Sequence, residues 1–426
     1  MQWLNRAMLR LLIENTLDRE EKIMAEWIEK TLGEVTSYIT KGIPPKYVDD
    51  ENPFSVWVLN QKCNRNFQIS YDDARIHDGE KAKVQDCKLL QEGDVLINST
   101  GTGTAGRVAQ IYNVPVPTTI DGHMILIRPT DEIDFLYFGY AIKNNQRKIE
   151  SLAEGSTGQT EINRRRLLDE VIIRFPQEKR VQKSIGTFIY NIDEKINNNI
   201  KINNNLEQQT QAIFKSWFVD FELNYGIMPS DWKVSQLGSI AKISTEVFSP
   251  AKNQNVEVEH YSIPAYDEKC YPVFETSNGI KSNKYRLSSN SVMISKLNPD
   301  TKRIWRPYCI SDNPICSTEF IVYEPINPLN RDFIYSIIDS IGFSAFLCSH
   351  TTGSTNSRQR ATPSITLTYD IVVPDEKTIR AFCSIVSPMY DTIENNIKEN
   401  QKLAETRDKL LPKLMSGELD VSDFDL

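Results

Sequence analysis

Residues Ile185–Trp217 read IGTFIYNIDEKINNNIKINNNLEQQTQAIFKSW, and residues Phe382–Leu414 read FCSIVSPMYDTIENNIKENQKLAETRDKLLPKL. Each stretch contains a mostly apolar series with a strict 4-3 spacing, and the second series follows the first at a constant offset of 197 positions. Apolar residues that recur every 3.5 positions or so keep one face of a helix against a partner helix along its length. The sequence therefore predicts two long helices, which most simply pair with each other.

Both apolar series are interrupted by two asparagines at the same two positions, Asn199 and Asn203 in the first and Asn396 and Asn400 in the second. A buried amide weakens packing but fixes the register of two helices, because a slipped alignment would leave the amide unpaired. Two unrelated amphipathic helices would explain the apolar positions but not the matched asparagines. We therefore expect these four asparagines to fix the register of the two paired helices.

The similarity between the two halves extends to the segments that precede the helices. Short apolar strands, a strand that ends on proline and a Thr-Gly-x-Thr turn occur in the same order in both halves, at Val95–Ile97 and Val292–Ile294, His123–Pro129 and Glu319–Pro325, and 157–160 and 352–355. Strands broken by Pro, Gly and Asn turns, with one helix expected at 135–153 and another at 331–348, indicate a mixed α+β unit of roughly 150 residues. A repeat whose offset stays within 195–197 positions predicts two copies of one such unit.

These features divide the chain into seven segments. They are a leader helix (1–25), a first α+β unit (26–177), a first long helix (178–222), a linker (223–230), a second α+β unit (231–375), a second long helix (376–415) and an acidic tail (416–426). The fold class is thus α+β, with two repeated units and two long helices that pair with each other.

The composition of the 426 residues is that of a globular protein, with 40% apolar and 25% charged residues. No apolar run reaches the roughly 18–20 residues that a membrane span requires, and the charged start of the chain does not resemble a signal peptide. Seven cysteines without a CxxC pair favour a reduced, cytoplasmic setting, and the four scattered histidines argue against a structural zinc site. A net charge of −8 leans against a nucleic-acid binder when taken alone.

The most suggestive motif is Gly101–Gly106 (GTGTAG), which has the GxGxxG pattern of dinucleotide sites. Such a site needs a helix directly after the glycines, whereas the residues that follow, RVAQIYNVPVP, predict a strand and a turn. Arg107 and Val108 also replace the Lys-Ser/Thr pair of a phosphate-binding P-loop. No motif for base methylation, hydrolysis or nuclease chemistry was found, and His350 fits a polar surface loop. The sequence therefore predicts a chain without catalytic chemistry of its own.

Basic and amide side chains, by contrast, gather in the loops of both units. Arg, Gln, Asn, Ser and Thr can bond to base edges, and Lys and Arg also neutralise phosphates. A solvated charged face is the ordinary explanation of one such cluster, but corresponding clusters in two repeats favour a DNA-contacting surface. The candidate residues are Ser99, Thr100, Thr102, Thr104, Arg107, Thr157, Gln159, Thr160, Arg164, Arg165 and Arg166 in the first unit, and Lys296, Lys302, Arg303, Trp305, Arg306, Thr355, Asn356, Arg358, Gln359 and Arg360 in the second.

Several blocks of the sequence resemble the specificity subunit of type I restriction–modification enzymes, and the resemblance covers almost the whole chain. Residues 206–221 (LEQQTQAIFKSWFVDF), followed by a restart at Trp232, are similar to the central conserved region of that family. Residues from Leu403 to Leu419 look like its C-terminal conserved region, and GDVLI (93–97) and GSTGQ (155–159) look like its target-recognition text.

The resemblance implies two target-recognition domains, each of which reads one half of a split sequence in double-stranded DNA. It also implies that the two helices form an antiparallel coiled coil, in a pseudo-twofold arrangement, that sets the gap between the halves. Asn199 and Asn203 would then face Asn400 and Asn396 and fix the register that determines this gap. A helix of 40 residues would span about 60 Å. Two modification (methyltransferase) subunits and the restriction (motor and nuclease) subunits would be the protein partners. S-adenosylmethionine, ATP and Mg²⁺ would be held by those partners, with no cofactor on this chain.

The chain departs from the family pattern in two places. The leader before Met24 is longer than the family's usual start, and the second unit lacks the glycine-rich loop of the first. Two alternatives also remain open at this stage. The chain could be a two-lobed adaptor that holds proteins instead of DNA, or an enzyme whose site carries no recognisable motif. Steep salt dependence of binding would distinguish a DNA reader from an adaptor.

Overall fold

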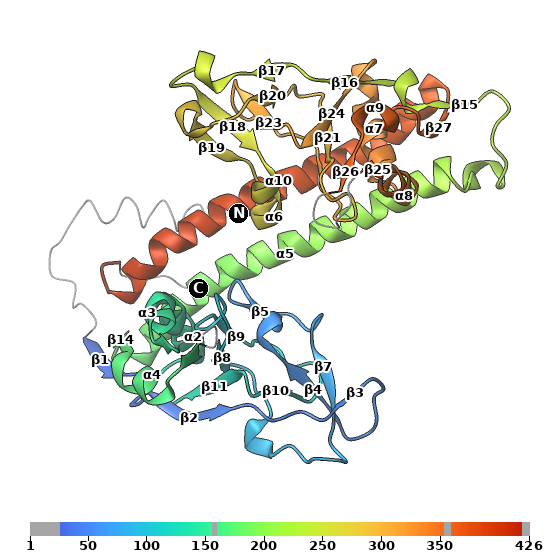
Figure 1. The fold of residues 1–426 in the computed structure, drawn as a ribbon. Coiled ribbons are helices and arrows are strands. Elements are labelled where there is room, and N and C mark those ends of the chain that lie inside the picture. The colour runs from blue at the N-terminus through green and yellow to red at the C-terminus, as the bar shows by residue number, and fades with distance from the viewer. Residues whose placement is uncertain (1–25, 156–159, 353–358, 420–426) are drawn as a thin grey trace. The chain divides into compact units, whose positions relative to one another are not determined.

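The computed structural model describes residues 26–155, 160–352 and 359–419. The chain forms two compact units. Within the described residues, unit 1 comprises 26–194 and 403–419, and unit 2 comprises 195–402. Each unit is described by itself below, and Figure 1 labels its elements.

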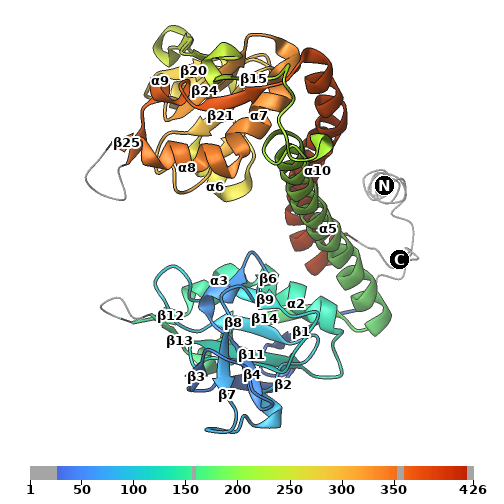
Figure 2. The same ribbon diagram turned by 90° about the vertical axis from the view of Figure 1, so that its right-hand side faces the viewer.

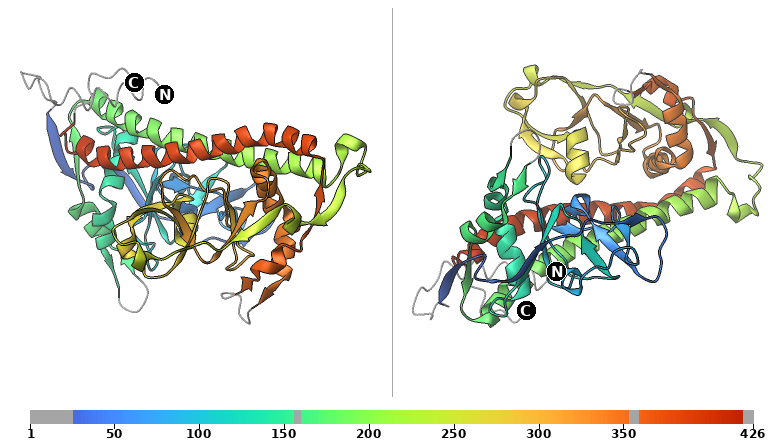
Figure 3. Two further views of the ribbon diagram at one scale, coloured as in Figure 1. Left: turned by 90° about the horizontal axis from the view of Figure 1, so that it is seen from above. Right: turned by 60° about the horizontal axis from the view of Figure 1, so that its bottom comes forward.

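The two long helices predicted from the heptads are confirmed. Helix α5 runs from Lys179 to Phe218 and helix α10 from Glu376 to Met415, so both are 40 residues long and their ends differ by the same offset as the sequence repeat. Both helices contribute residues to both units. In unit 2, the second part of α5 and the first part of α10 lie side by side and antiparallel, as Figure 3 shows, with Asn199 against Asn400 and Asn203 against Asn396.

In its described residues, unit 1 has two four-stranded sheets, three two-stranded sheets and three short helices, all of which precede α5. Its central antiparallel sheet has the order β2-β11-β8-β9, and a second sheet has the order β10-β4-β7-β3. The strands are β1 (Trp27–Thr31), β2 (Thr36–Lys41), β3 (Tyr47–Val48), β4 (Ser55–Leu59), β5 (Asn64–Arg65), β6 (Gln68–Ile69), β7 (Arg75–Asp78), β8 (Val95–Asn98), β9 (Val108–Gln110), β10 (Thr118–Ile120), β11 (Met124–Pro129), β12 (Ala153–Glu154), β13 (Glu161–Ile162) and β14 (Ile172–Pro176). The short helices are α2 (Phe135–Asn144), α3 (Gln146–Ser151) and α4 (Arg164–Glu170), and β1 closes the unit by pairing with β14.

Unit 2 repeats this plan. Its central sheet has the order β16-β24-β21-β22, and its second sheet has the order β17-β20-β23-β18-β19. The strands are β15 (Lys233–Gln236), β16 (Ala241–Ser244), β17 (Val247–Phe248), β18 (Glu257–Tyr261), β19 (Val273–Thr276), β20 (Lys284–Arg286), β21 (Val292–Ser295), β22 (Ile304–Trp305), β23 (Pro314–Ser317), β24 (Phe320–Pro325), β25 (Thr351–Thr352), β26 (Arg360–Ala361) and β27 (Asp370–Val373). The short helices are α6 (Ile263–Lys269), α7 (Arg331–Asp339), α8 (Ile341–Ser349) and α9 (Pro363–Thr366), and Figure 2 shows α7 and α8 on one side of β21 and β24.

The core of unit 2 explains how its helices and sheet hold together. Phe214 and Phe218 of α5 and Phe382 of α10 are buried in one cluster with Phe333 of α7 and strand residues such as Tyr323. The ring of Phe218 lies 5.0 Å from that of Phe333 and 5.0 Å from that of Phe382, in edge-to-face geometry. Such pairs add about 0.5–1.5 kcal/mol each to the burial of apolar area. The apolar residues of the heptads thus pack against the α+β unit as well as against each other.

The two helices expected at 135–153 and 331–348 are each broken in two. In unit 1 the break lies at Asn145, whose side-chain amide donates to the carbonyl of Ala141 and thereby competes with the regular helix ladder. In unit 2 the break lies at Ser340, which has extended backbone angles and whose hydroxyl accepts from the Phe343 amide as an N-cap. The helical character predicted from the sequence is present, but local capping divides each helix.

Among the described residues, no single helix is long and apolar enough to cross a membrane. One bent pair, residues 328–339 and 341–349, meets the criteria of length and composition when its two parts are taken together.

Candidate nucleic-acid interface

In unit 1, the loop after β8 is held directly against the hairpin of β12 and β13. Ser99 and Gly101 make the contacts: the Ile162 amide donates to the Ser99 carbonyl over 2.7 Å, and the Gly101 amide donates to the Thr160 carbonyl over 3.3 Å. An isolated antiparallel bridge joins Thr100 to Glu161. Two candidate segments that are about 60 residues apart in the sequence, 99–107 and 160–166, therefore form one surface.

Thr100 lies at the centre of this surface. Its hydroxyl receives a 2.8 Å hydrogen bond from the side-chain amide of Gln61 and lies 3.0 Å from Nδ1 of His123. The Gln61 amide also bonds to the Thr100 carbonyl. Gln61 belongs to neither of the predicted segments, so the sequence analysis missed the polar stretch from which it comes. The signal that could have found it is a run from Asn52 to Tyr71 that contains Lys62, Arg65 and several amides but no acidic residue.

The glycines of the loop provide its sharp turns. The φ angles of Gly101, Gly103 and Gly106 are +105°, +73° and +88°. Residues other than glycine rarely adopt these backbone angles. The loop returns directly into strand β9 and not into a helix. The strand that was predicted to follow the glycines is therefore present as β9.

The three arginines at the start of α4 differ in what they can do. Asn163 caps the helix by accepting from the amides of Arg165 and Arg166. Arg164 is exposed, and no ion pair is found for it among the described residues. Arg165 lies 3.6 Å from Asp169 with its side chain 91% exposed. Arg166 instead bonds to Glu170 and Glu154. The hydrogen bond from Arg166, with a further one from Lys148, lowers the pKa of Glu170 to about 2.

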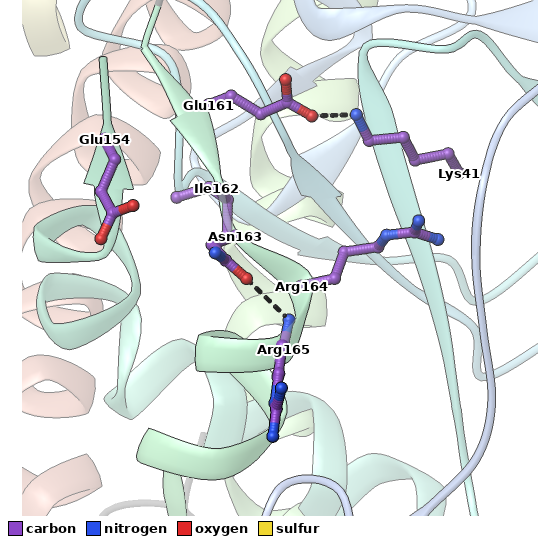
Figure 4. A pocket seen from close by; sticks show the side chains of 7 residues that line it. All are labelled: Lys41, Glu154, Glu161, Ile162, Asn163, Arg164 and Arg165. Atoms are coloured by element: carbon purple, nitrogen blue, oxygen red, sulfur yellow. Dashed lines mark hydrogen bonds and ion pairs between the residues drawn. The ribbon is translucent and has the colours of Figure 1, made fainter.

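Figure 4 shows the open pocket beside these arginines, which is lined by Lys41, Glu154 and residues 161–165. Its volume is about 530 Å³. Lys41 forms an ion pair with Glu161, and Figure 4 shows the Arg164 side chain extending on the same side as Lys41 while the Arg165 side chain points away from it. A pocket with exposed guanidinium groups suits an anionic ligand such as a phosphate, since Arg is always charged and carries several donors.

Unit 2 repeats the construction of this surface at the same place. The Asn298 amide donates to the Gln359 carbonyl over 2.9 Å, the Ala361 amide donates to the Lys296 carbonyl over 2.9 Å, and an isolated bridge joins Leu297 to Arg360. The loop after β21 is thus joined to the hairpin of β25 and β26, as the loop after β8 is joined to that of β12 and β13. The two units keep the same backbone construction and present different side chains on it.

Most of the predicted cations of unit 2 are engaged within the protein. Arg303 forms two hydrogen bonds of 2.6 and 2.9 Å with Asp267, and Lys302 pairs with Asp339. Arg360 bonds to Glu319 over 3.0 and 3.3 Å. Lys296 is half-buried, and no ion pair is found for it in the part of the chain that the structure describes. The predicted cations of unit 2 therefore contribute less unpaired positive charge to the surface than the sequence alone suggests.

Three of the candidate residues are buried, so their side chains do not lie on the exposed surface that was predicted to contact DNA. Trp305 is 2% exposed, and its ring lies 4.8 Å from that of Tyr261. Arg306 is 7% exposed and binds the carboxylates of Asp332, Asp391 and Glu394. Ser99 is fully buried at the base of its loop. Their side chains face protein atoms and leave no room for a base or a phosphate.

The other candidates lie where a ligand could reach them or outside the described residues. Thr102, Arg164, Arg165, Lys302 and Arg360 are exposed, whereas Thr100, Thr104, Arg107, Thr160, Arg166, Lys296, Arg303 and Gln359 are half-buried. Thr157, Gln159, Thr355, Asn356 and Arg358 lie outside the described residues. In the described ranges, no group of three or more His, Cys, Asp or Glu side chains is placed to hold a metal ion.

Comparisons with known proteins agree with one another. A family model described as "Type I restriction modification DNA specificity domain" matches residues 24–208. The Type I restriction enzyme MjaIX specificity subunit of Methanocaldococcus jannaschii is 24% identical, over 95% of this chain and 96% of the relative. The Type I restriction enzyme HindI specificity subunit of Haemophilus influenzae is 21% identical, over 93% of this chain and 100% of the relative.

The same plan occurs in a solved structure. The crystal structure of a type I restriction–modification system S subunit from M. genitalium superposes with a TM-score of 0.61 at 16% identity, over 93% of this chain and 97% of that one. This likeness concerns the fold, which has the same combination of mixed α+β units and long helices.

Proposed function

Because the chain is a member of the type I restriction–modification DNA specificity family, we propose that each of its two units reads one half of a divided sequence in double-stranded DNA. The observation that carries this proposal is the matched construction of the two surfaces. In each unit a loop of the central sheet is hydrogen-bonded to a short hairpin, at Gly101 to Thr160 in unit 1 and at Asn298 to Gln359 in unit 2. The same scaffold with different side chains is what two readers of two different half-sites require.

Within unit 1 we assign positioning and base contact to different residues. Arg164 and Arg165 are exposed cations at the rim and suit phosphates, which fix the position of the unit on the duplex. Thr100, Thr102 and Thr104 lie on the glycine-rich loop, and their hydroxyls can donate to or accept from base edges. In unit 2, Gln359 and Lys296 occupy the corresponding joint between loop and hairpin.

The two long helices are the proposed spacer between the half-sites and the attachment surface for two modification subunits. Each helix is continuous over 40 residues, which corresponds to about 60 Å at 1.5 Å per residue. Restriction subunits would complete the assembly. S-adenosylmethionine, ATP and Mg²⁺ would belong to those partners, and adenine methylation and ATP-dependent cleavage would be activities of the complex, in the cytoplasm.

The test is to produce the chain with its modification subunits in cells that lack adenine methylation and to map the methylated adenines by sequencing. We expect one divided sequence. The variant Arg164→Glu/Arg165→Glu should reduce methylation through one half-site only, whereas the matched variant Lys46→Glu/Lys83→Glu, which changes two exposed cations of unit 1 that lie outside this surface, should leave it unchanged. A loss that affects both halves equally, or neither, contradicts the assignment of unit 1 to one half-site. If the variant binds DNA as the wild type does, and this binding does not depend on salt concentration, the two-lobed adaptor would be favoured instead.

A further inference from the structure

The segment between two neighbouring antiparallel strands of the second sheet takes a different form in each unit. In unit 1, strands β4 and β7 are joined by a 3-10 turn at Gln61–Cys63 and the hairpin of β5 and β6. In unit 2, strands β18 and β19 are joined by helix α6. Both inserts touch the loop that carries the candidate residues of their own unit, through Gln61 in unit 1 and Asp267 in unit 2.

Two buried residues of the unit 1 hairpin, Asn64 and Phe67, hold it against the rest of the unit. Asn64 is fully buried, and its side-chain amide donates to Oδ1 of Asn98 over 3.1 Å and to the carbonyl of Arg107 over 3.0 Å. Phe67 is 6% exposed and bridges to Ala109 of β9. Its ring lies 5.2 Å from that of Tyr140. These contacts tie the hairpin to both ends of the loop Ser99–Arg107.

The turn of the hairpin carries backbone strain. Asn66 and Phe67 have φ angles of +54° and +64°, as in the two-residue turns that suit the twist of a hairpin. Asn tolerates this region, but Phe rarely adopts it, because its Cβ atom comes too close to the following carbonyl oxygen. The packing of the Phe67 ring on Tyr140, and the Lys143 ammonium group 4.4 Å from its centroid, hold it there. A strained residue that its surroundings hold in place marks a segment whose exact position matters.

The outer side of the same hairpin is polar and basic. Lys62, Arg65, Asn66 and Gln68 are exposed. Neither Lys62 nor Arg65 has an ion-pair partner among the described residues, and the chain contains no acidic residue from Asn52 to Tyr71. The next acid, Asp72, accepts a hydrogen bond from the Ser70 hydroxyl. Two free cations are therefore held on a rigid platform beside Thr100 and Arg107.

We propose that residues 61–68 are a third DNA-contacting segment of unit 1, in which Lys62 and Arg65 bind backbone phosphates next to the bases that face the loop Ser99–Arg107. This inference rests on the proposed function and adds an element to it. Gln61 acts as a positioning residue, because its amide holds both the hydroxyl and the carbonyl of Thr100. The contacts expected are those that fix register on the duplex, since phosphates carry no sequence information of their own.

The corresponding insert of unit 2 does not offer such a contact. Asp267 of α6 neutralises Arg303, and Tyr266 packs edge-on against Trp305 at 5.1 Å. The single cation of α6, Lys269, lies 3.8 Å from Glu268. The hairpin contact is thus specific to unit 1, and the two half-sites should contribute unequally to the salt dependence of binding.

The test uses the whole chain in complex with its modification subunits and a 40-base-pair duplex of mixed sequence. Binding is measured at a series of KCl concentrations for the wild type, for Lys62→Ala/Arg65→Ala and for the matched control Lys46→Ala/Lys83→Ala. The slope of log K against log salt concentration is negative, and each lost phosphate contact makes it less steep by about 0.9. The hairpin variant, which loses two contacts, should therefore have a slope that is less steep by about 1.8. The control should keep the wild-type slope, and Lys62→Arg/Arg65→Lys should restore it.

Each outcome decides between the two proposals. An unchanged slope in Lys62→Ala/Arg65→Ala, with a wild type that binds in a salt-dependent way, overturns the hairpin contact and leaves the proposed function intact. An equal loss in the control shows that only net charge matters and also overturns it. A wild type whose binding does not depend on salt overturns the proposed function and the hairpin contact together. Asn64 and Phe67 are unchanged in all variants, and equal thermal midpoints show that the fold is kept.

Discussion

Asn199 of α5 donates a hydrogen bond of 2.8 Å from Nδ2 to Oδ1 of Asn400 in α10. The same amide bonds to Glu399 over 2.8 Å, and Oδ1 of Asn199 accepts from Lys195 over 2.9 Å. Asn199 is fully buried, so all of these partners are needed to satisfy its polar atoms. One helical turn away, Asn396 donates to Asn203 over 2.8 Å. The two asparagine pairs join the helices in one register of unit 2.

Removing one partner of an asparagine pair should cost more than removing both. Asn199→Leu removes the donor to Oδ1 of the half-buried Asn400, which costs about 1–3 kcal/mol, whereas Asn199→Leu/Asn400→Leu removes both polar groups and should recover part of that loss. We expect to obtain the coupling energy between the two side chains from the free energies of unfolding of four proteins: the wild type, both single variants and the double variant. Strictly additive losses would show that the two side chains do not depend on each other. If the pairs also set the gap in the DNA target, replacing all four asparagines with leucine should change the spacing of the methylated sequence.

The stability of unit 1 should depend on pH through Lys143. Burial lowers the pKa of Lys143 to about 8, although Asp193, 3.5 Å from the ammonium group, acts in the opposite direction. An unfolded chain has a lysine pKa of about 10.4, so between these values the unfolded state binds more protons and stability rises with pH. Relative to Lys143→Met, the wild type should gain about 2 kcal/mol between about pH 8 and 9.5. Because the variant shares all other titrating groups, a difference that is constant with pH would exclude this role for Lys143.

The parts of the fold that recur at a constant offset could be predicted from the sequence. The helix ends at Lys179 and Glu376 and the asparagine pairs follow from heptads, whose spacing is a local property of each stretch. The hairpin at 61–69 could not be predicted, because its strands have two residues each and show no periodicity. Its position depends on Asn64 and Phe67, whose partners lie more than 30 residues away in the chain.

The candidate surface was predicted in outline, but not residue by residue. The two segments of each unit were identified from their side chains, and the structure brings them together at Gly101 and at Asn298. A basic stretch does not reveal which of its members find acidic partners far away in the sequence. Arg306 pairs with carboxylates that lie 26, 85 and 88 positions later, so its engagement could be seen only in the fold.

Arg306 should therefore matter for stability and not for DNA contact. It lies 2.9 Å from Asp332, 2.6 Å from Asp391 and 3.2 Å from Glu394, and so joins β22 to α7 and α10 within unit 2. Burial acts to raise the pKa of Asp332, but Arg306 and Arg331 outweigh it and the pKa is lowered. Arg306→Met leaves these carboxylates without their buried cation and should cost about 3–5 kcal/mol.

Arg303→Met is the matched control for this substitution. Arg303 pairs with Asp267, whose side chain is 47% exposed, and such a pair contributes up to about 1 kcal/mol. Urea denaturation of the two variants should give clearly different midpoints. Equal midpoints would mean that the buried cluster around Arg306 contributes no more than a surface pair.

Two glycines of the same loop should respond differently to the same substitution. A Cβ atom at Gly103 would meet nothing within 4 Å, whereas one at Gly106 would lie 2.7 Å from the Cα of Glu150. Both residues have positive φ angles, so Gly103→Ala should cost about 1–2 kcal/mol for the backbone conformation alone. Gly106→Ala adds an overlap with backbone that cannot rotate away, and overpacking of this kind costs about 1–3 kcal/mol more. Because the loop Ser99–Arg107 would have to move, Gly106→Ala should also weaken methylation at the half-site read by unit 1. Thermal midpoints and methylation maps of the two variants measure both effects, and a Gly103→Ala variant as impaired as Gly106→Ala would show that backbone conformation, and not the contact with Glu150, determines the position of the loop.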